Sequence, residues 1–289
     1  MMDLSPHMRQ AIDEARVSLR EGNCGFGAVI VKDGHQIAKS HDTEKTAKDA
    51  TAHAEITAIR TASAKLGRDL SGCIMVTTHE PCPMCSTAAL WSGISELAYG
   101  FSIEEAIGRQ RRRINITCKE IYERAGQEII IHQGILNAEC AVLYDNTVRD
   151  NIELLRDADQ NKLEKLAQEL TEKRLKWFSV NRTAFEIDRE NVVDIAYQLF
   201  LCKLEIGVAD APVVRRNENS LVLHSQNFCP TLEACKILNL DTRFVCRHLT
   251  EKPTTELLQL IHPKLQFTRN YERLRPHTPF CEEMIILDV

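Results

Sequence analysis

Hydrophobic and polar residues follow two different periods along the first half of the chain. Short apolar runs typical of buried strands alternate with segments in which apolar residues recur every three or four positions, as in helices. The predicted strands are 26–32, 35–40, 73–78, 95–100 and 128–132, with Asp33-Gly34 as a two-residue hairpin turn. The predicted helices are 8–19, 51–66, 84–91, 103–107, 119–124 and 136–144. Strands interleaved with helices predict a three-layer α/β sandwich around a mixed sheet.

The middle of the chain predicts a long helical stretch. No glycine occurs from residue 135 to 206 and no proline from 84 to 211. Apolar residues recur at helical spacing between Asn146 and Trp177, which predicts one amphipathic helix, or two with a break near 157–159. We therefore expect a first domain over 1–150, a helical linker over 151–180 and an accessory domain over 181–289.

The last part of the chain predicts a second, α+β domain. Its predicted strands are 220–224, 264–268 and 282–287. Its predicted helices are 191–206, 231–238, 241–249 and 254–261.

Length, composition and charge narrow the class of protein. The chain has 289 residues, 44% of them hydrophobic and 27% charged, so at about 150 residues per domain two domains are expected. The chain contains no apolar stretch of about 18 residues, so no membrane helix is expected. The charged N-terminus argues against a secretory signal. Eleven cysteines, an odd number, favour thiols or metal ligands in the reducing cytoplasm.

Neither half of the chain is basic. Residues 1–150 hold 17 lysines and arginines against 20 aspartates and glutamates, and the remainder holds 19 against 21. Proteins that bind nucleic acid over a long surface usually carry more basic than acidic residues. The composition therefore favours a small substrate. Arg109 and Arg111 to Arg113 form the one basic run of the first domain, which is either a solvated face or a contact for phosphate or a tRNA backbone.

Two short motifs carry the candidate chemistry. His53-Ala-Glu55 is an H-x-E triplet, and Pro81-Cys-Pro-Met-Cys85 is a P-C-x-x-C segment. Each lies at the start of a predicted helix, where partial positive charge stabilises thiolates. His53, Cys82 and Cys85 therefore predict a Zn²⁺ site with three protein ligands and one open position, the arrangement of catalytic zinc. Glu55 is the predicted catalytic residue, because a nearby carboxylate can take a proton from water and deliver it to a ring nitrogen and the leaving ammonia.

Other interpretations of these motifs are weaker. A lone C-x-x-C is compatible with a redox pair or half of a zinc finger, and a lone H-x-E is common by chance. The chain has no second C-x-x-C. Both motifs, in this order and separated by one predicted strand, favour the hydrolytic zinc site.

These residues give the chain a resemblance to the cytidine deaminase-like zinc deaminase superfamily. Residues 49–60 are similar to guanine deaminases, residues 80–85 to guanine and tRNA adenosine deaminases together, and residues 134–140 to the final helix of the tRNA and nucleoside deaminases. The resemblance covers residues 5–147. It implies a deaminase sandwich with a five-stranded sheet, hydrolytic release of ammonia from an amino-heterocycle, and a homodimer.

The resemblance also suggests substrate contacts at Phe26, Asp42 and Ala54. Asp42 stands where the family usually carries an asparagine. An ionised aspartate only accepts hydrogen bonds, so Asp42 is predicted either to read N–H donors, as on guanine, a pterin or an aminotriazine, or to be a surface carboxylate.

The second domain shows a shorter resemblance, to the aminothiazoline-carboxylate hydrolase-like family. It rests on Cys229-Pro230, Glu233-Ala-Cys235, Cys246-Arg247 and Cys281-Glu-Glu283. The spacing of these cysteines fits no metal pattern, which favours buried free thiols. A ligand-sensing or substrate-selecting role and a second amidohydrolase activity both stay open.

Three functions compete. The first is zinc-dependent deamination of a guanine-like base or a nucleoside, and the second is deamination of adenosine in tRNA. The third is a non-catalytic, zinc-stabilised, ligand-sensing module. Glu55 counts against the third, because a purely structural zinc site needs no base.

Overall fold

The computed structural model describes residues 2–185 and 192–288. The chain divides into two compact units, Met1–Asp150 and Asn151–Val289. Among the described residues, no helix combines the length and the apolar character needed to cross a membrane.

The first unit is built on a mixed five-stranded sheet in the order β2-β1-β3-β4-β5. Its strands are β1 (Gly27–Lys32), β2 (His35–His41), β3 (Cys73–His79), β4 (Glu96–Phe101) and β5 (Ile130–Gln133). β1 is antiparallel to β2 and β3, whereas β3, β4 and β5 run parallel. The predicted three-layer sandwich is confirmed, and the β1–β2 hairpin turns at Asp33-Gly34 as expected.

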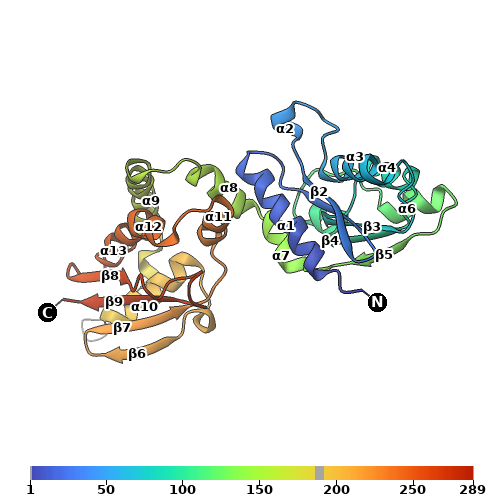
Figure 1. Ribbon diagram of the computed structural model, residues 1–289. Helices are drawn as coiled ribbons and strands as arrows, with labels where there is room; N and C mark the ends of the chain where they lie inside the picture. Colours follow the sequence, from blue (N-terminus) through green and yellow to red (C-terminus); the bar gives the residue numbers. More distant parts are fainter. Residues whose placement is uncertain (1, 186–191, 289) are drawn as a thin grey trace. The chain divides into compact units, whose positions relative to one another are not determined.

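Helices cover both faces of this sheet (Figure 1). One face carries α1 (Ser5–Arg20) and α7 (Asn137–Leu143), and the other carries α3 (Ala54–Leu66), α4 (Pro83–Trp91) and α6 (Cys118–Arg124). Short helices α2 (Glu44–Ala47) and α5 (Ile103–Gly108) follow β2 and β4. The sequence did not predict α2. Since both faces are covered, β1 is a continuous apolar run rather than an alternating one.

Gly27 marks the closest approach of α1 to the sheet. A Cβ atom at this position would lie 1.9 Å from the carbonyl oxygen of Ala11, so only glycine lets the helix pack here. One end of the sheet brings together the start of β1, the end of β2 and the carboxyl ends of β3 and β4. The candidate site described below lies at this end of the strands.

The second unit contains an antiparallel four-stranded sheet in the order β6-β7-β9-β8. Its strands are β6 (Val213–Asn217), β7 (Ser220–Ser225), β8 (Leu265–Arg269) and β9 (Cys281–Leu287). Its helices include α8 (Asn146–Leu155), which begins in the first unit, α9 (Gln160–Asn181), α10 (Val192–Leu204), α11 (Pro230–Leu238), α12 (Thr242–Cys246) and α13 (Lys252–Leu258). The expected helix over 191–206 begins at Asn191, which lies outside the described residues.

Three expectations about this region differ from the structure. The sequence pattern missed β6, because this edge strand is mostly exposed on both faces and shows no alternation. The helices expected at 241–249 and 254–261 form one continuous run, in which a π-helical turn, Arg247–Glu251, accommodates Pro253.

The third difference concerns the expected linker over 151–180. A break at Asp157, whose φ is 54°, separates α8 from α9, as one of the two interpretations predicted. However, α9 packs on α13 and the π-helical turn and buries Leu163, Ala167 and Phe178. Its apolar stripe is thus covered by the second unit, and α9 belongs to that unit's core.

Candidate active site

Three metal-ligand side chains converge between the starts of α3 and α4. His53 precedes the first turn of α3 and Cys82 precedes the first turn of α4, both in extended conformation, while Cys85 lies in that turn of α4. The Nδ1 atom of His53 lies 3.7 Å from the Sγ atom of Cys82 and 3.5 Å from that of Cys85, and the two sulfurs are 3.6 Å apart. Residues 29 to 32 positions apart in the sequence thus share one point in space.

The spacing of these three atoms fits zinc. With ordinary Zn–S and Zn–N bond lengths, a tetrahedral ion holds two sulfurs about 3.8 Å apart and a sulfur and a nitrogen about 3.5 Å apart. The observed separations of 3.5 to 3.7 Å agree with these values. Two thiols and one imidazole are also the donor types that zinc prefers.

The pKa values of the same three residues favour a bound cation. Hydrogen bonding by Cys85, and then by His53, lowers the pKa of Cys82 to about 4. The hydrogen bond with Cys82 raises the pKa of His53 to about 9, and Cys82 together with burial raises that of Cys85. A divalent cation bound at this point would take the place of the protons on His53 and Cys85.

Glu55 lies beside these three side chains, in the first turn of α3. Its side chain is only 4% exposed but still lines the cavity described below. Thr77 Oγ1 lies 3.5 Å from Glu55 Oε1. Burial, and then the negative charge of Cys82, raise the pKa of Glu55 to about 7. A carboxyl group with this pKa can both accept and donate a proton near neutral pH.

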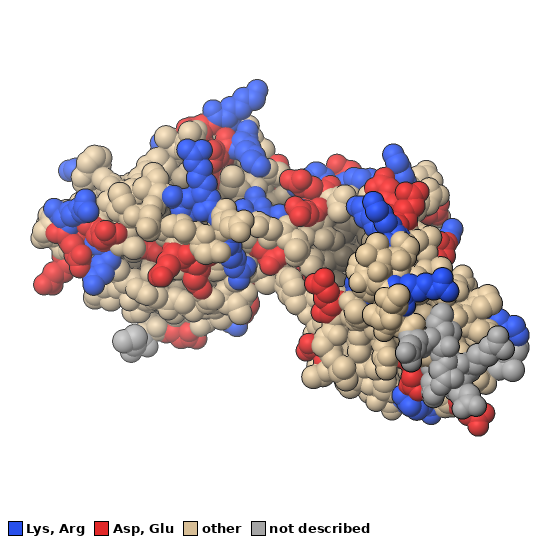
Figure 2. Space-filling view, turned by 180° about the vertical axis from the view of Figure 1, so that it is seen from behind, with Lys and Arg blue, Asp and Glu red and all other residues tan. Residues whose placement is uncertain are grey.

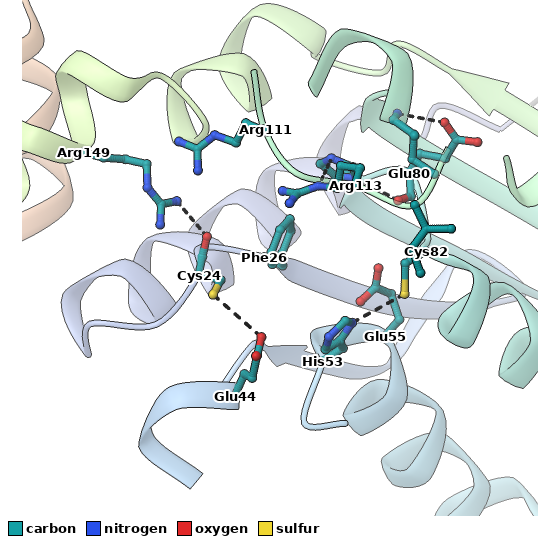
Figure 3. Close-up of a pocket in the computed structure, with 13 residues that line it drawn as sticks. Cys24, Phe26, Glu44, His53, Glu55, Glu80, Cys82, Arg111, Arg113 and Arg149 are labelled. Carbon is teal, nitrogen blue, oxygen red and sulfur yellow. Dashed lines mark hydrogen bonds between the residues drawn. The ribbon is translucent and has the colours of Figure 1, made fainter. Parts of the chain in front are cut away.

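A cavity of about 200 Å³ opens over these residues. Figure 3 shows His53, Glu55 and Cys82 on one side of it, Arg111 and Arg149 on the other, and Phe26 between them. Its lining residues are Cys24, Phe26, Glu44, His53, Glu55, His79, Glu80, Cys82, Ile103, Arg111, Arg113, Ile114 and Arg149. A space below the ~300–1,000 Å³ of drug-sized ligand pockets suits a small ring.

Glu80, which lines the cavity, fixes the starts of two helices. Its buried carboxylate accepts the backbone N–H of Ile103 at 3.0 Å through Oε2 and that of Cys118 at 3.0 Å through Oε1. Ile103 and Cys118 are the first residues of α5 and α6. Helix N-termini carry unpaired N–H groups and partial positive charge, so one carboxylate holds both helix starts.

An aromatic group forms one wall of the cavity. Phe26 meets His79 edge to face, with 5.4 Å between ring centroids, and stacks on Tyr144 at 5.4 Å. The guanidinium of Arg113 lies 5.3 Å above the Phe26 ring. Phe26 is thereby held with part of its ring in the cavity.

The basic run divides between two environments. Arg111 and Arg113 belong to an irregular segment after α5 and line the cavity, whereas Arg109 and Arg112 are exposed and do not. Arg149, from α8, joins the first pair and donates to the carbonyl oxygen of Cys24 at 2.9 Å. Arg149 and Glu44 were not predicted from the sequence, since nothing in their local pattern distinguishes them from solvated charges.

The expected substrate residues lie at different depths. Phe26 lines the cavity, whereas Asp42 and Ala54 are fully buried and are not among its lining residues. Asp42 Oδ1 accepts from the N–H of Cys24 at 3.2 Å, and Oδ2 is buried without a hydrogen-bond partner. Asp42 is thus no surface carboxylate, and burial raises its pKa.

The cysteines of the second unit do not form a metal cluster. Within residues 2–185 and 192–288, potential metal-ligating groups occur at His53, Cys82 and Cys85 and at Cys24, Asp42 and Glu44. Cys229, Cys235, Cys246 and Cys281 are free thiols, of which Cys235 is fully buried. The resemblance of this unit to a hydrolase family stays a prediction.

Comparison with known proteins places the first unit among deaminases. Residues 1–101 match the family described as "Cytidine and deoxycytidylate deaminase zinc-binding region". Guanine deaminase of Bacillus subtilis is 45% identical over 93 residues, which cover 32% of this chain and 60% of that protein. The match thus spans about three fifths of this relative's length.

Longer matches come from tRNA deaminases. The tRNA-specific adenosine deaminase of Streptococcus pyogenes serotype M18 is 33% identical over 147 residues, covering 50% of this chain and 90% of that protein. Among solved structures, guanine deaminase of Bacillus subtilis is 39% identical, covers 37% of this chain and 70% of that one, and superposes with a TM-score of 0.35.

Proposed function

This chain belongs to the cytidine and deoxycytidylate deaminase family, and on that premise we propose that its first unit hydrolyses the exocyclic amine of an amino-heterocycle. The observation that carries the proposal is the convergence of His53, Cys82 and Cys85 beside the buried carboxyl group of Glu55. A purely structural zinc site needs a fourth protein ligand and no base.

His53, Cys82 and Cys85 would hold the zinc ion of this family. When bound, the ion supplies Lewis acidity that makes water easier to deprotonate near neutral pH.

Glu55 moves the protons of the reaction. Its carboxylate accepts a proton from the attacking water and donates it to the ring nitrogen next to the carbon that bears the amine. A second proton passes through Glu55 to the amine, the carbon–nitrogen bond breaks, and ammonia leaves as the ring carbonyl forms. The pKa of about 7 fits both directions of transfer.

A guanine-like base or a nucleoside is the substrate that we propose. Phe26 gives the cavity wall an apolar ring surface that a heterocycle can contact. Asp42 and Ala54 lie directly behind or beside lining residues, Asp42 with a carboxylate oxygen that lacks a partner. We propose that this oxygen accepts a hydrogen bond from an N–H donor. The donor belongs either to the substrate or to a protein group that shifts when the substrate binds.

Adenosine in tRNA is the second candidate substrate. The relative matched over 90% of its length is named a tRNA-specific adenosine deaminase, and Arg111 and Arg113 line the cavity. Against it, the first unit has no basic surplus.

We also propose that the protein is a homodimer. Ile56, Ile59, Ala88 and Trp91 form the apolar part of a shallow groove on α3 and α4, which Arg60 and Arg68 also line, and Trp91 is 74% exposed. An exposed apolar patch of this kind is typical of an interaction surface.

Ammonia release tests the proposed function. The panel contains guanine, guanosine, cytosine, cytidine, adenine, adenosine, a pterin, an aminotriazine and an anticodon stem-loop RNA. We expect release from a heterocycle of the panel and none with Glu55→Ala. Zinc-loaded protein that releases no ammonia from any of them would favour the non-catalytic, ligand-sensing alternative.

A further inference from the structure

A groove of about 560 Å³ lies on the second unit, between α9 on one side and the π-helical turn and α13 on the other. We call it the α9 groove. Ala167 and Thr171 are the buried residues of its lining, 4% and 8% exposed. π-helical turns are frequent at functional sites. The deamination that we propose for the first unit leaves this groove without a role.

The two walls of the α9 groove carry opposite charge. Glu164 and Glu172, about two helical turns apart on α9, line one wall. Arg247, in the π-helical turn, and Lys252, at the start of α13, line the other. Gln168 lies between the two glutamates and adds an amide group to the acidic wall. The groove thus offers hydrogen-bond acceptors on one wall and cationic donors on the other.

These opposite charges do not pair across the groove. Within residues 2–185 and 192–288, neither glutamate of the acidic wall forms an ion pair, and Arg247 forms none either. Glu164 Oε1 instead accepts from Gln160 Nε2 at 2.8 Å, within α9. Glu256, the third carboxylate of the lining, lies on α13 with Oε1 3.7 Å from Lys252 Nζ, and such exposed pairs contribute little to stability. The charges of the two walls therefore remain available to a ligand.

Arg247 is oriented by an aromatic contact that leaves its hydrogen-bond donors available. The Cζ atom of its guanidinium lies 4.3 Å from the centroid of the Tyr271 ring. The hydroxyl of Tyr271 donates to Glu251, which fixes the ring. In the described part of the chain, the Arg247 side chain donates to no hydrogen-bond acceptor. A guanidinium held over an aromatic ring can still form two parallel hydrogen bonds with a carboxylate.

A buried arginine adds positive charge close to the basic wall. Arg174 continues the face of α9 that carries Ala167 and Thr171, is 5% exposed, and donates through Nη1 to Thr254 Oγ1 at 2.6 Å. Among the residues that the structure describes, no carboxylate pairs with it. Burial, and then the charge of Arg269, lower the pKa of Arg174 to about 10, so it stays protonated at neutral pH. A buried cation without a carboxylate is unfavourable, and an anionic group in the groove would reduce this cost.

We propose that the α9 groove binds a free amino acid, whose carboxylate contacts the basic wall at Arg247 and whose ammonium group contacts the acidic wall at Glu164 and Glu172. Carboxylate and guanidinium form charge-assisted hydrogen bonds, and an ammonium group has three N–H donors for the acceptors of the acidic wall. One small molecule then compensates the charges of both walls. On this assignment the second unit binds a ligand of its own, independently of the deamination that we propose for the first unit.

A polyanion fits the second unit less well than a small zwitterion. Nucleic acid needs a basic surface, whereas residues 151–289 hold 19 lysines and arginines against 21 aspartates and glutamates. In Figure 2, blue and red side chains are interspersed over the face drawn, without one large patch of either sign. An anion alone would also leave Glu164 and Glu172 without a partner. A ligand that carries both charges satisfies the two walls together.

Calorimetry with the intact protein tests the ligand class. The probes are the standard amino acids together with β-alanine and 4-aminobutyrate, in which the two charges are further apart. We expect at least one of them to bind, and its N-acetyl derivative and its amide, which each lack one charge, to bind about tenfold more weakly or less. No binding of any probe overturns the proposal. Equal binding of the N-acetyl derivative or of the amide also overturns it, because one wall is then not used.

Matched variants test the position of the site. Arg247→Gln and Glu172→Gln each remove one charge of the groove, and we expect each to weaken binding about 10- to 100-fold, the range for a lost hydrogen bond to a charged group. Arg215→Gln and Glu169→Gln remove exposed charges of the same unit that do not line the groove and should leave the affinity unchanged. Circular dichroism checks that all four variants fold. Binding that persists in both groove variants, or that falls equally in the controls, places the amino acid elsewhere and overturns the proposal.

Discussion

Arg113 donates a hydrogen bond from Nε to Nε2 of His79 across 3.3 Å. The other ring nitrogen of His79, Nδ1, lies 2.8 Å from the carbonyl oxygen of Glu80, which can only accept. His79 is therefore neutral, with its proton on Nδ1 and a lone pair on Nε2 that accepts from Arg113. His79, at the end of β3, thus orients the side chain of Arg113, which lines the cavity.

This relationship predicts a pH dependence of stability. Burial lowers the pKa of His79 from 6.5 to about 4. Between these values the unfolded chain binds the proton and the folded one does not, so the free energy of unfolding falls as pH drops from about 6.5 to 4. The loss is about 3.5 kcal/mol at about 1.4 kcal/mol per pKa unit. Urea unfolding at pH 4 to 7 should show a shallower dependence for His79→Gln, and parallel curves would contradict the assignment.

Replacing Glu55 should abolish catalysis but not metal binding. Glu55→Gln keeps the size of the side chain and removes the proton acceptor, so we expect kcat/KM to fall by about 10²- to 10⁴-fold. Zinc content, measured by atomic absorption, should stay at the wild-type level because Glu55 is not among the three converging candidate ligands. Activity close to wild type would exclude Glu55 as the proton shuttle.

Removing a candidate ligand should remove the metal. We expect one zinc ion per wild-type chain and less than a tenth of that in Cys85→Ser, since a serine hydroxyl is a poor zinc ligand beside a thiolate. Cys202→Ser changes an exposed cysteine in the second unit and serves as the control. Equal zinc content in the two variants would place the metal elsewhere.

The buried carboxylate of Glu80 should contribute strongly to the stability of the first unit. Glu80→Gln leaves one of the two N–H groups, of Ile103 or Cys118, facing an amide donor. We expect a loss of about 2 to 4 kcal/mol in the free energy of unfolding, the range for a charge-assisted hydrogen bond and an unsatisfied buried donor. Glu104→Gln alters an exposed residue of the same unit and should cost little; equal effects would show that Glu80 does not anchor the helices.

The exposed apolar groove gives a test of the homodimer. Trp91→Arg places a charge on the surface of α3 and α4, and we expect the mass measured by light scattering to fall from that of two chains to that of one. Trp177→Arg is unsuitable as a control because Trp177 packs on the core of the second unit. Val180, 78% exposed in α9, offers the matched change Val180→Arg, which should leave the mass unaltered. A monomeric wild type would refute the proposal.

The sequence alone determined the features that depend on local spacing. Covered strands appear as apolar runs, helices as three- and four-residue periods, and His53, Glu55, Cys82 and Cys85 as two motifs at helix starts, since each of these is a property of neighbouring residues. The same local logic failed for β6, whose exposed faces leave no period, and at Pro253, where a π-helical turn lets the helix continue.

Only the tertiary structure decided which distant residues share the cavity. Arg149 reaches it because α8 brings its side chain to the backbone of Cys24, 125 positions earlier in the chain. Arg111 and Arg113 face the cavity and Arg112 does not, because the irregular segment after α5 lies against His79 and Tyr144. Asp42 is buried through the packing of β2 against the start of β1, not through its own sequence surroundings. Such contacts arise when helices pack on a sheet. The pattern of apolar and polar residues along the chain does not predict which individual side chains then meet.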